Sequence, residues 1–287
     1  MLKLRTAAVG VGSSEALIWI GDCRCVRGVR KVQCEIASLG VIALHKRSDL
    51  RGVLAHEARD TWPVFGRRVT ICALASKQLD TSVAVILDYK AGNLASVKRA
   101  CEHVGMQVEY CDDPDQLRHA ERAIFPGVGA AGSAMRSLRA RGLDEALLEV
   151  IKHGMPVLGI CLGMQVSLTH SEENDTATLG LIPGAVRRFA FDRQDLKIPH
   201  MGWNEVRVVQ EHPVLADIQA GDEFYFVHSY FPQPQDPEAV LAVTDYEGDF
   251  ACAIGRDNYI GTQFHPEKSA QVGLRLLANF SKWNGLC

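Results

Sequence analysis

A cysteine between two glycines is the pattern in this sequence with the clearest chemical meaning. Gly159-Ile160-Cys161-Leu162-Gly163 follows a short apolar run and precedes a stretch with helical spacing. A nucleophile elbow requires this strand–turn–helix setting, because the glycines let strand and helix approach closely around a strained turn. A helix start behind the sulfur favours the thiolate, which is the attacking form. A lone cysteine after a strand is more often a small buried hydrophobe, but the two glycines favour a nucleophile at Cys161.

Among the ten histidines, His265 is the strongest candidate for the base that a thiolate nucleophile needs. It follows an apolar run and is itself followed by Pro266 and Glu267. In an extended segment residues i and i+2 point the same way, so the Glu267 carboxylate is expected beside the imidazole. Considered alone, the pair is better explained as a surface histidine with a solvated glutamate. Together with the elbow, it favours a triad of Cys161, His265 and Glu267.

Two backbone amides are candidates for stabilising an oxyanion intermediate. One is the amide of Leu162, directly after the nucleophile. The second would come from Pro126-Gly127-Val128-Gly129, because its glycines free the backbone to turn an amide inward at the end of another expected strand. A tight structural turn explains this second motif nearly as well when it is taken alone.

From residue 83 onward the sequence alternates between strand and helix patterns, which predicts a parallel sheet covered on both faces. The expected strands are 83–87, 107–111, 122–125 and 156–160, and the expected helices are 94–104, 143–153 and 162–171. Later strands over 223–227, 240–244 and 259–263 lack long helices between them, which predicts an antiparallel addition. A last helix is expected from a Ser269 cap to about Trp283. The expected class is α/β, with a mostly parallel mixed sheet.

The composition divides the chain into two segments. The 287 residues carry a net charge of -3 and are 47% hydrophobic, which excludes disorder throughout and argues against a nucleic-acid-binding protein. Residues 1–82 nevertheless hold 13 basic and 7 acidic side chains, whereas 83–287 hold 18 and 27. The nine cysteines have no tight, repeated spacing, so a reduced, cytoplasmic protein is expected. Cys23, Cys25, Cys34 and His45 fit no common zinc pattern, and no metal or cofactor is expected.

Residues 1–82 contain no motif with a recognisable chemical role, and glycines interrupt both the helical and the strand periodicity of the apolar residues. No methionine lies between Met1 and Met106, so a natural start near residue 83 would need a different start codon. We therefore expect an N-terminal extension that is disordered, of unknown purpose or a start-site artefact, and favour the artefact. The functional domain is expected over 83–287.

Several linked motifs resemble the class I glutamine amidotransferases, and within them the glutaminase subunits of imidazole glycerol phosphate synthase. The motifs are Gly159–Gln165, His265–Ser269, Asp88-Tyr89 with Gly92-Asn93-Leu94, Pro126–Gly129, Pro199–Asn204 and His228–Tyr230. They cover 83–287 in order, and the resemblance implies a flavodoxin-like sheet. Amidotransferases for anthranilate or guanylate share the elbow and His-Pro-Glu, but are not expected to share Met201–Asn204 or Pro266–Ser269. One departure is Lys90, where the family usually has glycine.

The resemblance implies glutamine hydrolysis through a thioester. Cys161 would attack the side-chain amide, His265 would shuttle the proton and Glu267 would orient the imidazole. The amides of Val128 and Leu162 would form the oxyanion hole. The implied glutamine-binding residues are Gly129, Gln165, Glu173, Ser229 and Tyr230. His228 would lie beside the pocket without acting as the base.

The resemblance also implies a partner that consumes the ammonia. This would be the (β/α)8-barrel cyclase subunit, which makes imidazole glycerol phosphate and aminoimidazole carboxamide ribotide in histidine biosynthesis. The 82 residues outside the amidotransferase segment are too few for such a barrel, so a heterodimer is implied. Lys268, Tyr225 and Asn93 are the implied interface residues. The alternatives are a glutaminase subunit of another class I amidotransferase, such as anthranilate synthase, and a catalytically silent scaffold on the same fold.

Overall fold

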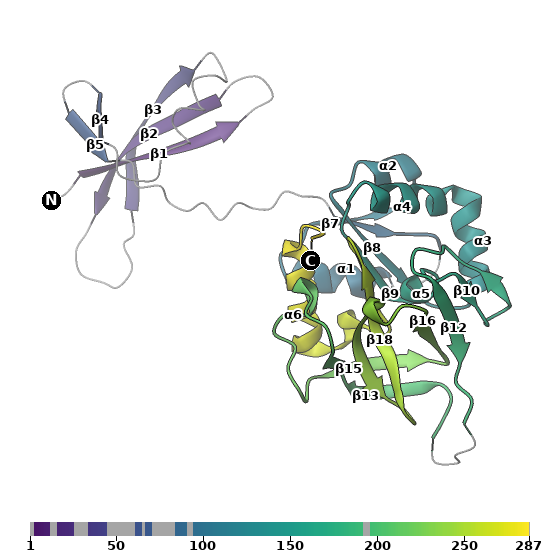
Figure 1. The fold of residues 1–287 in the computed structure, drawn as a ribbon. Coiled ribbons are helices and arrows are strands. Elements are labelled where there is room, and N and C mark those ends of the chain that lie inside the picture. Colours follow the sequence, from purple (N-terminus) through teal and green to yellow (C-terminus); the bar gives the residue numbers. More distant parts are fainter. Residues whose placement is uncertain are drawn as a thin grey trace. The chain divides into compact units, whose positions relative to one another are not determined.

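The computed structural model of the chain falls into two compact units, Met1–Leu79 and Asp80–Cys287 (Figure 1). It describes residues 84–90, 94–191 and 196–286 in full, and in the first unit the backbone of 3–11, 16–25, 34–44, 61–64 and 67–70. Each unit is treated by itself below.

The first unit contains a three-stranded antiparallel sheet and a separate hairpin. The sheet has the order β1 (Lys3–Val11), β2 (Ala16–Cys25), β3 (Cys34–Leu44), and the hairpin pairs β4 (Thr61–Val64) with β5 (Arg67–Thr70). The sequence, with its many glycine interruptions, predicted no elements here. The role and order of residues 1–82 and the domain boundary at 83 stay predictions, and His45 lies outside the described residues.

The second unit is built on an eight-stranded mixed sheet. Its order is β14 (Arg207–Val208), β17 (Val240–Asp245), β18 (Asp249–Arg256), β19 (Tyr259–Thr262), β9 (Val157–Cys161), β8 (Arg122–Gly127), β6 (Ala84–Leu87) and β7 (Val108–Cys111). The strands from β19 to β7 are parallel, and the others pair antiparallel. This confirms the predicted mixed α/β sheet.

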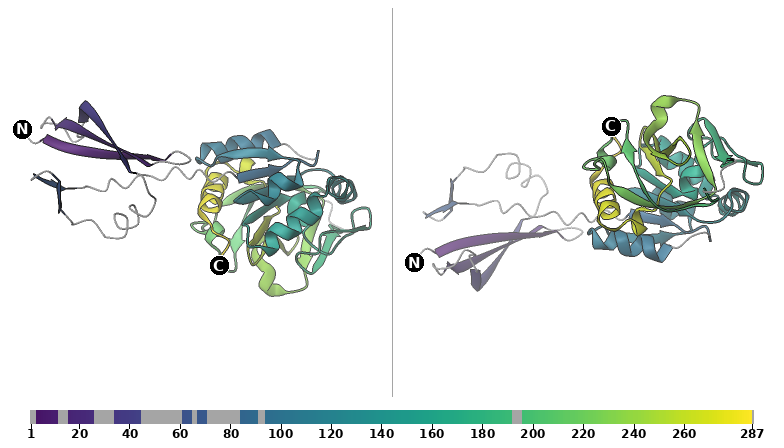
Figure 2. Two further views of the ribbon diagram at one scale, coloured as in Figure 1. Left: turned by 90° about the horizontal axis from the view of Figure 1, so that it is seen from above. Right: turned by 90° about the horizontal axis from the view of Figure 1, so that it is seen from below.

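Alternate residues of the buried strands point into two separate cores. In β6, Ala84 and Ile86 join the cluster that includes α1 (Leu94–His103) and α6 (Ala270–Lys282). Val85 and Leu87 join the cluster on the other face, with α2 (Pro114–Arg118), α3 (Ala131–Arg141) and α4 (Leu143–Lys152). Figures 1 and 2 show these helices on the two sides of the sheet. A strand covered on both faces has a continuous run of apolar residues, so such strands can be predicted from the sequence.

Two smaller sheets extend the unit and carry parts of the site. One has the order β11 (Thr176–Ala177), β10 (His170–Ser171), β12 (Gly184–Arg188), β16 (Tyr230–Pro234). The other pairs β13 (His200–Glu205) with β15 (Glu223–His228). Short 3-10 helices occur at Pro213–Leu215 (η2), Pro237–Ala239 (η3) and Pro266–Lys268 (η4).

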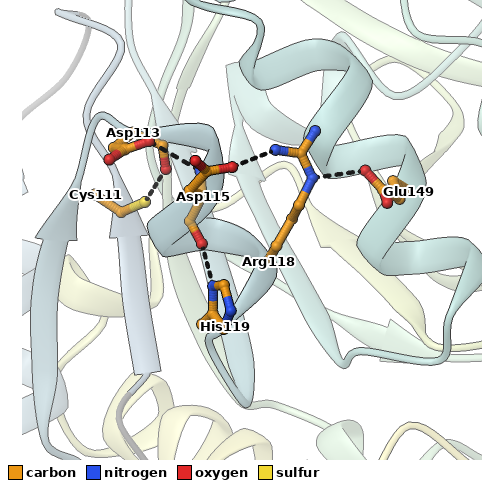
Figure 3. Close-up of polar contacts among 6 residues, drawn as sticks. All are labelled: Cys111, Asp113, Asp115, Arg118, His119 and Glu149. Atoms are coloured by element: carbon orange, nitrogen blue, oxygen red, sulfur yellow. Dashed lines mark hydrogen bonds and ion pairs between the residues drawn. The ribbon is translucent and has the colours of Figure 1, made fainter.

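A network of exposed polar contacts joins α2 to α4 (Figure 3). Arg118 donates to Glu149 at 2.7 Å and to Asp115 at 2.9 Å. The hydrogen bond from Arg118 lowers the pKa of the Glu149 carboxyl. The Asp113 side chain caps α2 by accepting from the Asp115 amide. Because these ion pairs are exposed to solvent, they contribute little to stability.

Lys90 lies in the left-handed region, with φ of 67°, in the first turn after β6. Its amide donates to Asp88 at 2.9 Å. The turn therefore tolerates lysine where the related family usually has glycine, at a strain cost of about 1 kcal/mol. In the described parts of the chain, no helix combines the length and apolar character needed to cross a membrane.

Candidate active site

The backbone at Cys161 has the strained geometry of a nucleophile elbow. Cys161 ends β9 with φ of 53° and ψ of -105°, a conformation that a side-chain-bearing residue rarely adopts. A Cβ at Gly159 would run into the Tyr259 hydroxyl, and one at Gly163 would run into the Phe125 carbonyl. The two glycines are therefore required by close packing, as the sequence pattern indicates.

The helix after the nucleophile is much shorter than predicted. The expected helix over 162–171 is wrong, because α5 spans only Leu162–Gln165. Tertiary donors take the carbonyls that would continue it: Tyr259 donates to Gly163 at 3.3 Å, and the Leu179 amide to Val166 at 2.9 Å. A single turn offers free amides near the sulfur but a much smaller summed dipole than a long helix.

His265 and Glu267 form a buried pair, as the sequence predicts. His265 precedes η4, and its Nδ1 lies 2.9 Å from Glu267 Oε1, with only 3% and 4% of the two side chains exposed. His265 Nε2 and Glu267 Oε2 are buried and have no hydrogen-bond partner among the described residues. Burial alone would lower the His265 pKa, but the Cys161 sulfur and Glu267 outweigh it and raise the pKa to about 10. This favours an imidazolium next to the sulfur.

Ser269 does not cap α6 as predicted, since its side chain makes no capping hydrogen bond. Its hydroxyl instead donates to the His265 carbonyl at 2.6 Å and accepts from the Tyr225 amide at 3.0 Å. The His265 amide also donates to the Tyr225 carbonyl at 3.0 Å. The loop that carries the imidazole is thus fixed to β15.

The Pro126–Gly129 turn lies beside the elbow. Parallel pairing of β8 with β9 sets Gly127 opposite Cys161. Tyr89 donates to the Pro126 carbonyl at 3.0 Å, and a Cβ at Gly127 would collide with its hydroxyl. Gly129 has φ of +103°, and Val128 is 44% exposed. The two amides predicted for an oxyanion hole, of Val128 and Leu162, therefore belong to neighbouring segments at one sheet edge.

The predicted glutamine-binding residues come together in two groups. Gln165 is 5% exposed, and its Nε2 donates to the Tyr230 carbonyl at 2.9 Å. Ser229 links β15 to β16, where its carbonyl accepts from the Phe189 amide at 3.1 Å. Glu173 Oε2 accepts from the Ala131 amide at 2.7 Å, directly behind the turn that contains Gly129. The structure therefore brings these five residues to the same edge of the sheet as Cys161.

Gln263 is a site residue that sequence reasoning missed. Its Nε2 donates to the Cys161 sulfur at 3.6 Å, its Oε1 accepts from Gln165 Nε2 at 3.0 Å, and it is 0% exposed. The sequence places it in the strand before His265 and suggests no role for it. The available signal was one amide side chain within an otherwise apolar run, two residues from the expected base.

The predicted interface residues lie around an exposed aromatic patch. Lys268 Nζ is 5.7 Å from the Tyr225 ring, which meets Trp203 edge-on at 6.2 Å. Trp203 is 50% exposed and Met201 62% exposed, both on β13. Asn93 lies outside the described residues. We call Met201, Trp203, Tyr225 and Lys268 the β13 patch.

Burial raises the thiol pKa of three other cysteines of the second unit, Cys101, Cys111 and Cys252. Burial, with smaller contributions from Glu267 and Glu102, raises the pKa of the Cys101 thiol to about 12, and burial also raises the pKa of Cys252. Such thiols stay protonated and inert. Within 84–90, 94–191 and 196–286, no group of three or more His, Cys, Asp or Glu residues is arranged to hold a metal ion.

Comparison with known proteins agrees with this geometry. The glutamine amidotransferase class-I family matches residues 85–283. Imidazole glycerol phosphate synthase subunit HisH of Desulfovibrio desulfuricans is 50% identical over 203 residues, which are 69% of this chain and 93% of that protein. The proteins of the same name from Thiobacillus denitrificans and Neisseria meningitidis serogroup B are 46% and 45% identical, covering 72% and 69% of this chain and 93% and 98% of those proteins.

Solved structures share the fold at much lower identity. A glutamine amidotransferase crystal structure aligns with a TM-score of 0.56 and 18% identity, over 70% of this chain and all of that chain. PurLQS from Thermotoga maritima aligns with a TM-score of 0.54 and 16% identity, over 69% of this chain and 96% of that one. With the elbow and the buried His–Glu pair in place, the chain belongs to the class-I glutamine amidotransferase family and, within it, to the HisH subunits of imidazole glycerol phosphate synthase.

Proposed function

We propose that this chain hydrolyses L-glutamine through a thioester on Cys161. The observation that carries the proposal is a buried His265–Glu267 pair, 2.9 Å apart, whose imidazole pKa is raised by the sulfur of Cys161 in a strained elbow. The Cys161 thiolate attacks the side-chain amide carbon, and a carbon–sulfur bond forms as the carbonyl π electrons move to oxygen. When the intermediate collapses, the carbon–nitrogen bond breaks, and the nitrogen takes a proton from His265 Nε2 and leaves as ammonia.

The second half reverses these roles. Water gives a proton to His265 Nε2 as its oxygen attacks the thioester carbon, and collapse breaks the carbon–sulfur bond. The new carboxylic acid loses its remaining proton to water and leaves as glutamate, and the thiolate and imidazolium are restored. Throughout, Glu267 holds Nδ1 protonated and fixes the ring orientation, as the carboxylate of such triads does. The amides of Val128 and Leu162 stabilise both oxyanions.

Glutamine selection rests on the two groups of polar residues around the elbow. Gln165 with the Ser229–Tyr230 segment would bind the amino-acid end of the substrate on one side. Gly129 and Glu173 would bind it on the other, since Glu173 is anchored by the Ala131 amide at 2.7 Å. A carboxylate there complements the substrate ammonium group.

The ammonia would pass to a (β/α)8-barrel cyclase subunit in a heterodimer, which makes imidazole glycerol phosphate and aminoimidazole carboxamide ribotide. The name of the relatives, imidazole glycerol phosphate synthase subunit, supports this partner. The β13 patch is the proposed docking surface, with Asn93 as a further contact. Its exposed tryptophan and methionine are residues of the kind enriched at interfaces.

The test compares two nitrogen sources in the presence of a cyclase partner and its substrate. Cys161→Ala should abolish glutamine-dependent synthesis and leave ammonia-dependent synthesis at the wild-type rate. Cys111→Ser, which changes a cysteine outside the site, is the matched control. Unchanged glutamine hydrolysis in Cys161→Ala would remove Cys161 from the nucleophile role. Glutamate release by the wild type without any ammonia transfer to the cyclase would contradict the partner.

The same assay tests the proposed domain boundary. A chain that begins at residue 83 should match the full chain in glutamine-dependent and ammonia-dependent rates, because the family match starts at residue 85. A loss of glutaminase activity on removal of residues 1–82 would assign that segment a role in the site. The cytoplasmic location expected from the cysteine content stays a prediction.

A further inference from the structure

A completely buried glutamine, Gln263, connects the nucleophile to a glutamine-binding residue. Its Nε2 donates to Cys161 Sγ at 3.6 Å, and its Oε1 accepts from Gln165 Nε2 at 3.0 Å. With 0% exposure, it cannot exchange either partner for bulk water. A buried amide with both ends in use fixes the distance between its two neighbours.

The hydrogen bonds determine which way each amide faces. The two hydrogens of Gln165 Nε2 go to the carbonyl of Tyr230 at 2.9 Å and to Gln263 Oε1. Since Gln165 must donate to Gln263, the remaining donor end of Gln263 faces the sulfur. Gln165 Oε1 makes no hydrogen bond within the described residues. This oxygen therefore remains free to accept a hydrogen bond from a substrate.

The Tyr230 carbonyl is also hydrogen-bonded to a pair of histidines, His228 and His200, of which His228 makes the direct contact. His228 Nδ1 lies 2.8 Å from this carbonyl, and His228 Nε2 lies 3.0 Å from His200 Nδ1. Burial lowers the pKa of His228 to about 3 and that of His200 to about 4, so both rings are neutral and each has one donor. If Nδ1 carries the proton in both rings, every contact has a donor and an acceptor.

The series continues to the strand that carries the β13 patch. Asn204 Nδ2 lies 3.3 Å from His200 Nε2 and 2.8 Å from the Asp245 carbonyl. Seven groups from Asn204 to the Cys161 sulfur are therefore connected by hydrogen bonds, and the direction of donation reverses at the Tyr230 carbonyl, which accepts from both His228 and Gln165. Within it, Gln263 is the member that contacts the reacting atom.

We propose that Gln263 is a further residue of the glutaminase site and has two roles, one for each end of its side-chain amide. Its N–H end donates to the Cys161 sulfur and stabilises the thiolate for attack. Its oxygen holds Gln165 so that Gln165 Oε1 accepts from the substrate ammonium group. The inference rests on the proposed glutaminase function, and it predicts that the donor end affects kcat and the acceptor end affects KM.

The experiment replaces Gln263 in the full chain and measures glutamine-dependent synthesis with the cyclase partner. Gln263→Met has a similar volume and removes both hydrogen bonds, so kcat should fall about tenfold and KM should rise about tenfold. Gln263→Glu keeps an acceptor for Gln165 and loses the amide donor, so kcat should fall while KM stays within about threefold of wild type. Gln107→Met and Gln107→Glu, at an exposed position before β7, are the matched controls.

A second measurement is independent of turnover. Alkylation of Cys161 by iodoacetamide, followed by peptide mass mapping, should slow several-fold at neutral pH in Gln263→Met and stay unchanged in the Gln107 variants. Circular dichroism and co-elution with the cyclase in size-exclusion chromatography verify that each variant folds and binds the cyclase. If Gln263→Met does not fold, the isosteric Gln263→Glu carries the test through its kcat alone.

The possible outcomes separate this inference from the proposed function. Wild-type kcat, KM and alkylation rate in a folded Gln263→Met would overturn both roles. A KM in Gln263→Glu as high as in Gln263→Met would overturn the positioning of Gln165. A wild-type chain that releases no glutamate with its partner would instead contradict the glutaminase function itself.

Discussion

Two buried histidine sites of the second unit have opposite charge states, although solvent is excluded from both. At the first, burial opposes charge, but the Cys161 sulfur and Glu267 raise the His265 pKa to about 10. At the second, burial lowers the pKa of His200 to about 4 and of His228 to about 3. Burial by itself therefore keeps an imidazole neutral, and at His265 the Cys161 sulfur and Glu267 outweigh that effect.

The second site has aromatic rings where the first has a carboxylate. His200 stacks on Tyr246 at 4.0 Å and on Phe226 at 4.8 Å, and His228 packs against Phe189 and Phe250, each at 5.4 Å. No carboxylate hydrogen-bonds to either ring among the described contacts. With no carboxylate to stabilise a charged form, these neutral rings are poorly suited to proton transfer. They can still donate a hydrogen bond that holds a carbonyl in place. The comparison therefore separates His265, for which we propose proton transfer, from His200 and His228, for which we expect only a positioning role.

The largest effect should come from removing the charge that distinguishes the first site. In Glu267→Gln the amide can still bond to the ring but no longer stabilises an imidazolium, so glutamine-dependent activity should fall about 10³-fold or more. Ammonia-dependent synthesis should be unchanged. Steady-state rates with the two nitrogen sources measure this, and the exposed Glu211→Gln is the control. A loss below tenfold would mean that the two histidine sites differ less in function than in electrostatics.

The pH dependence of stability should have opposite signs at the two sites. An unfolded histidine titrates near 6.5, whereas folded His200 and His228 stay neutral down to about 4 and about 3. Below pH 6.5 the unfolded state binds protons that the folded state refuses, so each ring should cost about 1.4 kcal/mol per pH unit. Above pH 6.5 the two rings contribute no pH dependence.

His265 should behave in the reverse way. It keeps its proton up to about pH 10 when folded, so its contribution is complete below pH 6.5 and is lost as the pH rises from 6.5 toward 10. Urea unfolding at pH 5.5, 7 and 9 tests both signs. His265→Asn should flatten the alkaline side, and His200→Phe the acid side. Matching slopes in wild type and variants would contradict the assigned charge states.

The sequence predicted the contact between His265 and Glu267 but not the one between His200 and His228. His265 can be identified because its carboxylate partner is two residues away in the chain, within the reach of local reasoning. His200 and His228 are 28 residues apart and meet only through the pairing of β13 with β15. Gln263 was missed for the same reason, since its partner Gln165 is 98 residues away. Contacts that depend on sheet register leave little local signal.

The fold shows the same limit. The buried parallel strands and α1, α4 and α6 carry apolar periods in their own residues, so they were predicted nearly to the residue. The predicted helix over 162–171 failed because tertiary donors capture its carbonyls after one turn. Nothing in the sequence of residues 162–171 indicates that tertiary donors compete with the helix for these carbonyls. The sequence thus predicts what a segment prefers, and tertiary hydrogen bonds decide where it stops.

A smaller effect is expected from opening the histidine pair. His200→Phe preserves the ring stacking but leaves His228 Nε2 buried without a donor, which should cost about 1–2 kcal/mol of stability. Because the Tyr230 carbonyl then loses a fixed partner, KM for glutamine should rise a few-fold with kcat nearly unchanged. Kinetics and urea unfolding measure the two effects, and exposed His103→Phe is the control. A large fall in kcat with normal KM would mean that His200 and His228 take part in proton transfer, which would contradict the difference in role from His265.

The smallest effect should come from a third buried histidine that belongs to neither site. His212 accepts from the Val214 amide at 3.1 Å, meets Trp283 edge-on at 4.9 Å, and has its pKa lowered to about 4 by burial. His212→Asn keeps the side-chain cap of η2, so it should cost no more than about 1 kcal/mol at pH 7 and leave both activities unchanged. It should still reduce the loss of stability below pH 6.5, because one neutral ring is gone. An effect on KM comparable to that of His200→Phe would mean that neutral buried histidines influence the site through general stability, and not through the hydrogen bond to Tyr230.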